Sequence, residues 1–201
     1  RSYLKIQDGC DYPCTYCTIP QARGKSRNDN IENILNNIKI LEKNNISEIV
    51  ITGVNIGDYG RTSKKYNLYK LINTINQLTS ISRFRISSIE PNLLTKEIIE
   101  FIRDNSNFLP HFHIPLQSGN DTILRLMKRK YDSKMYKNKI EMIKKNMPEA
   151  CIGADVIVGF PNESDDDFNS TYKFIKNLGI NYLHVFSYSN RNGTIATEMN
   201  N

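Results

Sequence analysis

Residues 6–24 of this chain read IQDGCDYPCTYCTIPQARG and place three cysteines in a short polar loop directly after an apolar stretch. Cys10, Cys14 and Cys17 follow a C-x3-C-x2-C spacing, and the remaining cysteine is Cys151. Three clustered thiols and one distant thiol differ from the evenly spread cysteines of a disulfide framework. The loop therefore indicates metal binding in a reducing compartment, and we expect a cytoplasmic protein.

The apolar residues beyond this loop alternate between short strand-like stretches and longer helix-like ones. Strands are predicted at 4–7, 48–53, 83–88, 111–116, 152–158 and 182–188, the fifth of them apolar enough for burial on both faces. Helices are predicted at 29–43, 68–78, from Thr95 onward, 122–127, 133–146 and from Ser164 to Asn177. Alternating strands and helices with right-handed crossovers favour a parallel α/β sheet, either doubly wound or curved into a complete or partial barrel.

The composition suits one globular domain. A chain of 201 residues can bury one sizeable core and is short for two. The longest apolar runs have the length of strands, so we expect no membrane partner. The formal charge of +6 permits binding to a polyanion such as nucleic acid but does not require it.

Polar and glycine-containing loops follow each predicted strand. They read GCDYPCTYC, TGVNIGDYG, SSIEP, PLQSGND, VGFPNES and SYSNRNG in chain order. The carboxyl ends of parallel strands meet at one edge, where ligands bind in barrels and in doubly wound sheets. The sequence therefore predicts one composite site built from several loops.

The cysteine loop leaves the type of metal site open. A structural zinc needs a fourth cysteine or histidine, and the three histidines are distant in sequence, at 111, 113 and 184. His111 and His113 lie in a predicted strand, where a packed or surface side chain is the simpler interpretation. Iron-sulfur clusters usually take four cysteines, so three would leave one metal position open for chemistry. A zinc or ferredoxin-like binding module remains the alternative.

The C-x3-C-x2-C loop after a first strand, with Tyr16 before its last cysteine, resembles that of the radical S-adenosylmethionine superfamily. The resemblance implies a partial (β/α)6 barrel in which the three cysteines hold a [4Fe-4S] cluster. It also implies that S-adenosylmethionine binds the fourth iron. One electron from the cluster would then cleave the sulfonium and yield a 5'-deoxyadenosyl radical.

Within that superfamily the whole chain, residues 1–201, resembles the central domain of the methylthiotransferases. The carrying stretches include TGVNIGDYG (52–60), RFRISSIEP (83–91), HFHIPLQSGND (111–121), LRLMKRKY (124–131), ACIGADVIVGFPNES (150–164) and YLHVFSYSNRNGT (182–194). The first and fifth favour the branch that converts N6-threonylcarbamoyladenosine in tRNA to its 2-methylthio derivative. The alternatives are the isopentenyladenosine branch and the branch that modifies a ribosomal protein. Asn162 stands where the family usually has glycine, a change that left-handed backbone angles of Asn would tolerate.

The resemblance also assigns cofactor contacts. Gly53 and Asn55 would receive the methionyl amino group, and Arg125 the carboxylate. Ribose or carboxylate contacts fall to Glu90, Gln117 and Ser118, and the adenine would be enclosed by Tyr16, Gly159, Phe160 and the backbone near Val185 and Phe186. Each of these residues could equally serve as a turn residue or helix cap.

Two basic groups and one distant cysteine lie outside these assignments. Arg23, Lys25 and Arg27 follow the cysteine loop and could contact tRNA phosphates, or form a solvated loop in which Arg23 makes an internal ion pair. Residues 128–130 (KRK) are predicted to complement the dipole at a helix end. Cys151 precedes a buried strand and is expected to belong to the core.

The resemblance further implies segments that this sequence lacks. Methylthiotransferases resemble one another in having an N-terminal domain that binds a second [4Fe-4S] cluster and a C-terminal RNA-binding domain. Because the chain starts at Arg1 and not at Met, we expect a domain taken from a longer protein. The expected partners are tRNA and an electron donor such as flavodoxin or ferredoxin.

Overall fold

Six parallel strands form the centre of the computed structural model, which describes residues 1–61, 63 and 66–199. They are β1 (Ser2–Asp8), β3 (Glu48–Gly53), β4 (Arg83–Ile86), β5 (His111–His113), β6 (Cys151–Val158) and β7 (Tyr182–Ser187). The strands pair in parallel in the order β1-β3-β4 and β5-β6-β7. Parallel bridges from Phe84 to Phe108 and from Ser88 to His113 join the two sheets.

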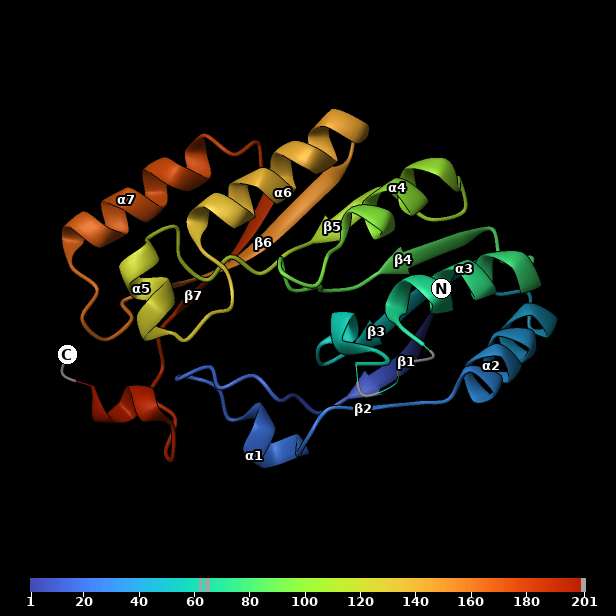
Figure 1. Cartoon of the computed structure of the whole chain (residues 1–201), viewed down its shortest axis with the longest axis horizontal. Coiled ribbons are helices and arrows are strands. Elements are labelled where there is room, and N and C mark those ends of the chain that lie inside the picture. The colour runs from blue at the N-terminus through green and yellow to red at the C-terminus, as the bar shows by residue number, and fades with distance from the viewer. Residues whose placement is uncertain (62, 64–65, 200–201) are drawn as a thin grey trace.

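The resulting sheet curves into an open barrel. The two-residue β2 (Arg27–Asn28) pairs antiparallel with β1 and forms one edge, and β7 forms the other. Figure 1 shows the larger helices as an outer arc around the strands, with the loop after β1 on the open side. The expected partial (β/α)6 barrel is thus confirmed.

The helices begin where polar side chains cap them. The main ones are α2 (Ile31–Lys43), α3 (Leu68–Leu78), α4 (Lys96–Asp104), α5 (Asp121–Leu126), α6 (Ser133–Asn146) and α7 (Asp165–Lys176). Thr95 caps α4, and Ser164 forms a capping box with Asp167 at the start of α7, which confirms both predicted starts. Within the described residues no helix is long and apolar enough to cross a membrane.

The core lies between this arc of helices and one face of the sheet. Ile152, Ala154 and Val156 alternate along β6 and belong to the core, together with the apolar faces of the helices. The sequence predicts burial on both faces of β6, but Asp155 and Ile157 on its other face are only half-buried. Asp155 and Ile157, on this inner face of the open barrel, line a cavity.

Several short elements differ from the predicted ones. β5 ends at His113, before Pro115, which cannot donate to a strand ladder. The helix α1 (Ile19–Arg23), the strand β2 and the 3-10 turns η1 (Ile56–Asp58) and η2 (Ile195–Glu198) were not predicted. Each has five residues or fewer, too few for a periodic apolar pattern to develop.

Candidate active site

The cysteine loop leaves β1 through a backbone conformation that requires glycine. Gly9 has φ +69°, and a Cβ at this position would lie 2.1 Å from the carbonyl oxygen of Lys25. The amide of Cys10 then donates to the carbonyl of Gly24 at 3.1 Å. The loop is therefore held against the segment that follows α1.

The C-terminal segment packs on the same loop. The side chain of Gln21 donates to the carbonyl of Gly193 at 2.7 Å, and the amide of Ala196 donates to the carbonyl of Thr15 at 2.9 Å. In Figure 1 this segment lies beside the loop and α1, although it is separated from them by most of the chain. Contacts from both ends of the sequence therefore fix the loop.

Each of the three loop sulfurs accepts an N–H group. The amide of Tyr12 donates to Cys10 Sγ at 3.4 Å, and the amide of Ile19 donates to Cys17 Sγ at 3.4 Å. The guanidinium of Arg129 donates to Cys14 Sγ at 3.2 Å. Hydrogen bonds of this kind stabilise thiolates, which are the form in which sulfur binds metals.

The three thiols share one cavity of about 380 Å³, and all are free. Burial raises the pKa of Cys10 and of Cys14, so these thiols stay protonated until a cation replaces their hydrogens. The described residues that line the cavity include three cysteines and no histidine. Three soft ligands with donors to each sulfur fit an iron-sulfur cluster better than a closed four-ligand zinc site.

Arg129 is buried beside this cavity, and its side chain is 4% exposed. It forms an ion pair with Glu90 and donates to the hydroxyl of Tyr16 at 3.2 Å and to that of Tyr131 at 3.1 Å. The prediction of a helix-end charge at 128–130 is therefore wrong for Arg129. Its guanidinium connects the predicted residues Glu90, Tyr16 and Cys14 into one polar network.

The backbone after α5 explains why Arg129 turns inward. Lys128 has φ +54°, a left-handed conformation that reverses the chain at the end of the helix. Lys130, in contrast, stacks over the ring of Tyr12 at 3.9 Å. Three consecutive basic residues thus have different surroundings, which their sequence alone does not reveal.

A second cavity of about 440 Å³ adjoins the cysteines along the inner face of the barrel. Its lining includes Tyr16, Cys17, Gln117, Asp155 and Phe186. Aromatic and apolar walls with a few polar groups are typical of a site for a small organic ligand. Asp155 was not predicted, because an acidic residue in an apolar strand sequence gives no sign of the face it occupies.

Phe160 and Gly159 do not belong to the described residues that line this cavity. Phe160 is buried and packs edge-on against Tyr16, with ring centroids 6.3 Å apart, so it supports the aromatic wall. Gly159 has φ +71°, and its amide donates to Glu163 Oε2 at 2.5 Å. Asn162, in the same turn, has φ +65°, as expected for an Asn in a glycine position.

Gly53 and Asn55 lie at the end of β3 in a tightly packed region. A Cβ on Gly53 would lie 2.7 Å from the carbonyl oxygen of Gln7. The amide of Asn55 donates to Gln7 Oε1 at 2.8 Å, and its side-chain nitrogen donates to Asp58 at 3.2 Å. The remaining side-chain oxygen of Asn55 is buried without a partner among the described residues.

Ser118 and Arg125 line neither of these two cavities. The Ser118 hydroxyl pairs with that of Thr171 at 3.0 Å and accepts from the amide of Asn120 at 3.1 Å. Arg125 is exposed on α5 and donates to the hydroxyl of Thr122 at 3.0 Å. The structure thus brings Tyr16, Glu90 and Gln117 to the cysteines but leaves these two residues outside the cavity linings.

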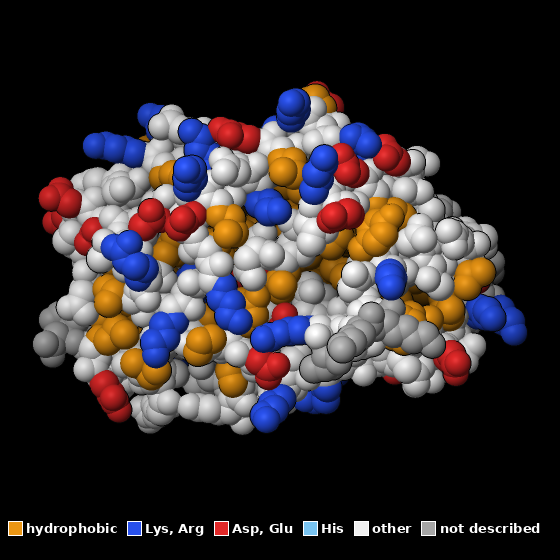
Figure 2. Space-filling model, viewed as in Figure 1, with side chains coloured by type: hydrophobic (Ala, Val, Ile, Leu, Met, Phe, Trp, Pro, Cys, Tyr) orange, Lys and Arg blue, Asp and Glu red, His pale blue; other side chains and the backbone are white. Residues whose placement is uncertain are grey.

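The basic residues after the loop are partly paired. Arg27 and Arg23 form ion pairs with Asp8 at 2.7 Å and 3.6 Å, whereas Lys25 lines the cysteine cavity. On the face drawn in Figure 2, Lys and Arg side chains are scattered among Asp and Glu. The charge is therefore spread over this face of the molecule.

This chain is similar in sequence to the Radical SAM superfamily and to tRNA-modifying enzymes. The family model of the Radical SAM superfamily matches residues 4–175. The threonylcarbamoyladenosine tRNA methylthiotransferase MtaB of Aquifex aeolicus is 42% identical over 199 residues, covering 99% of this chain and 48% of that protein. The tRNA-2-methylthio-N(6)-dimethylallyladenosine synthase of Staphylococcus aureus is 34% identical over 201 residues, covering 99% and 39%. The chain therefore spans about half or less of the length of these relatives.

Solved structures show the same fold at low sequence identity. The radical S-adenosylmethionine methyltransferase TsrM of Kitasatospora setae has a TM-score of 0.80 at 11% identity, covering 98% of this chain and 38% of that one. The coproporphyrinogen III oxidase HemN of Escherichia coli has a TM-score of 0.68 at 15% identity, covering 98% and 46%. Because the family model includes the cysteine loop and most of the barrel built around it, this chain belongs to the radical SAM superfamily.

Proposed function

We propose that Cys10, Cys14 and Cys17 hold a [4Fe-4S] cluster whose open iron binds S-adenosylmethionine. When bound, the cluster would supply one electron for cleavage of the sulfonium of S-adenosylmethionine to methionine and a 5'-deoxyadenosyl radical. The observation that carries this proposal is the set of three free thiols in one cavity, each sulfur accepting an N–H group.

The residues around the thiols have separate tasks in this proposal. Arg129 donates to Cys14 and is itself held by Glu90, so the pair orients one cluster ligand and keeps positive charge near the thiolates. Tyr16 and Gln117 line the adjoining 440 Å³ cavity and would contact the adenosyl group there. Phe160 packs edge-on against the ring of Tyr16 and supports its position.

For the whole protein we propose methylthiolation of N6-threonylcarbamoyladenosine in tRNA. Relatives from two bacteria that carry this activity in their names are each 42% identical to the chain. The remaining length of the protein would supply the second cluster and the RNA-binding domain, and flavodoxin or ferredoxin would supply electrons. The alternative substrate is dimethylallyladenosine in tRNA, because the synthase named for that nucleoside is 34% identical to the chain.

Anaerobic reconstitution with iron and sulfide tests the cluster assignment. We expect about four iron atoms per chain and loss of most of them in Cys14→Ala, because two thiolates hold such a cluster poorly. Cys151→Ala is the matched control, since Cys151 is outside the cysteine cavity, and it should keep its iron. Equal iron in both variants, or folding that depends on zinc, would contradict the assignment.

The tRNA of cells that lack the full-length gene tests the substrate. Mass spectrometry of its nucleosides should show 2-methylthio-threonylcarbamoyladenosine replaced by the unmethylthiolated form. The dimethylallyladenosine derivatives serve as the internal control and should stay unchanged. Loss of the dimethylallyl product instead would assign the other substrate.

A further inference from the structure

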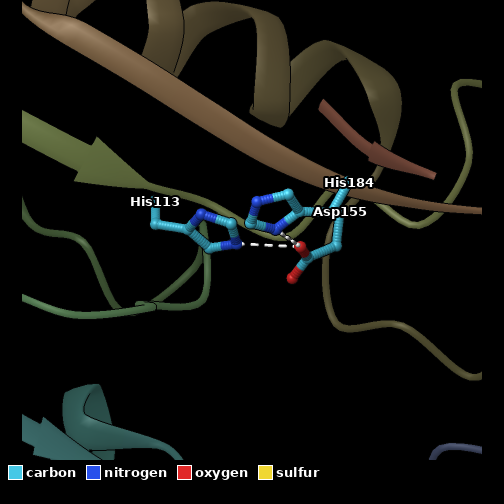
Figure 3. Close-up of side chains that lie close together, drawn as sticks. All are labelled: His113, Asp155 and His184. Atoms are coloured by element: carbon cyan, nitrogen blue, oxygen red, sulfur yellow. Dashed lines mark hydrogen bonds and ion pairs between the residues drawn. The ribbon is translucent and has the colours of Figure 1, made fainter. Parts of the chain in front are cut away.

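Three side chains meet on the inner face of the barrel, as Figure 3 shows. Asp155 Oδ1 lies 2.9 Å from Nε2 of His113 and 3.1 Å from Nδ1 of His184. Asp155 and His184 are direct partners in the ladder between β6 and β7, and His113 comes from the neighbouring strand β5. A carboxylate oxygen can only accept, so both ring nitrogens carry the hydrogens.

The hydrogen bonds continue from His113 deeper into the barrel. In the tautomer with its hydrogen on Nε2, His113 has a bare Nδ1, which accepts from the hydroxyl of Tyr182 at 3.3 Å. The oxygen of Tyr182 in turn lies 3.1 Å from Nε2 of His111, which donates to it. Burial lowers the pKa of His111 and keeps its ring neutral. The series of hydrogen bonds therefore runs from His111 through Tyr182 and His113 to Asp155, which is the final acceptor.

Within this hydrogen-bonded series, Asp155 lines the 440 Å³ cavity, together with Tyr16, Cys17 and Gln117. Both hydrogen bonds fall on Oδ1, which leaves Oδ2 with no partner among the described residues. Burial by itself would raise the pKa of Asp155, but the hydrogen bonds from His113 and His184 hold it below its usual value. The cavity thus has a fixed carboxylate with one oxygen available.

We propose that Asp155 is a ligand-binding residue of this cavity, where its free oxygen accepts hydrogen bonds from the donor groups of an adenosyl ligand, and that His113 is its positioning residue. The ligand class rests on the proposed function. The role of His113 rests on the contacts above: its ring is packed beside Tyr182, and its Nε2 holds the carboxylate in one orientation.

The same three side chains could also supply ligands to a transition-metal ion, because their ligand atoms lie within 4.8 Å of one another. The hydrogen bonds favour the first interpretation. Both nitrogens already donate to a single oxygen at ordinary hydrogen-bond lengths, and a metal would require both to lose these hydrogens. Zinc binding is therefore an opposing outcome of the test.

Calorimetric binding of S-adenosylhomocysteine to the anaerobically cluster-loaded chain tests the proposal. Asp155→Asn should raise the dissociation constant about tenfold or more, because a charge-assisted hydrogen bond is lost. His113→Phe removes the positioning donor and should raise it severalfold, whereas His113→Gln keeps a donor and should stay within about twofold of the unchanged chain. Asp104→Asn, which removes an exposed carboxylate outside the cavity lining, is the matched control.

Iron content and thermal unfolding of each variant distinguish a local effect from misfolding. An unchanged dissociation constant in Asp155→Asn, or no difference between His113→Phe and His113→Gln, would overturn the inference while the proposed function stands. One equivalent of Zn²⁺ bound by the cluster-loaded chain and lost in Asp155→Asn would overturn it in favour of a metal site. If the unchanged chain binds no S-adenosylhomocysteine, the proposed function falls and the inference with it.

Discussion

Arg129 is buried, although its position in a run of three basic residues predicts an exposed charge at a helix end. The family resemblance assigns Arg125 to the cofactor carboxylate, and the basic run at 128–130 is predicted to complement the dipole at a helix end. The left-handed turn at Lys128 decides which arginine points inward, and a sequence pattern does not specify that turn. Arg129 is buried against Glu90, whereas Arg125 is exposed.

Substitution Arg129→Met should lower the free energy of unfolding by about 3 kcal/mol, because it leaves the carboxylate of Glu90 without its buried partner. Urea unfolding followed by circular dichroism measures this change. The exposed Arg125→Met is the matched control and should stay within about 0.5 kcal/mol of the unchanged chain. Equal losses in the two variants would show that the Arg129–Glu90 pair contributes nothing to stability.

Most secondary-structure elements were predictable because their apolar periods and caps extend over many residues. Thr95 and Ser164 mark helix starts in the sequence as they do in the structure. The cysteine loop was also recognisable from its spacing. The adjoining α1 and β2 could not be predicted from an apolar pattern. Their conformation is determined by contacts with Asp8, Gly9 and the C-terminal segment.

Iron binding should depend on the backbone conformation with which the cysteine loop leaves β1. Gly9→Ala places a Cβ 2.1 Å from a backbone oxygen at φ +69°, so the loop must move and the chain should lose most of its iron after reconstitution. Gly24→Ala has a comparable φ of +73° but no atom within 4 Å of the added Cβ. It should keep its iron and cost about 1–3 kcal/mol of stability, because φ 73° with ψ −164° is a conformation that essentially only glycine adopts. Iron analysis of both variants compares them directly, and full iron in Gly9→Ala would contradict this view of the loop.

At the scale of the whole molecule, the open barrel could be predicted, but the arrangement of its interior could not. Strand and helix order, together with the cysteine spacing, leads to a partial (β/α)6 barrel. The partners of Asp155 come from β5 and β7, which are about thirty or more residues away along the chain, and only strand pairing brings them together. The histidines at 113 and 184 therefore looked unrelated in the sequence, although their rings lie 5.2 Å apart.

Formation of 5'-deoxyadenosine by this chain is the most direct measure of whether the barrel generates a radical. The anaerobically reconstituted chain is reduced with dithionite, mixed with S-adenosylmethionine, and the nucleoside products are separated and quantified. We expect 5'-deoxyadenosine from the unchanged chain and none above background from Cys14→Ala. A well-formed cluster that leaves S-adenosylmethionine intact would contradict the proposed radical chemistry.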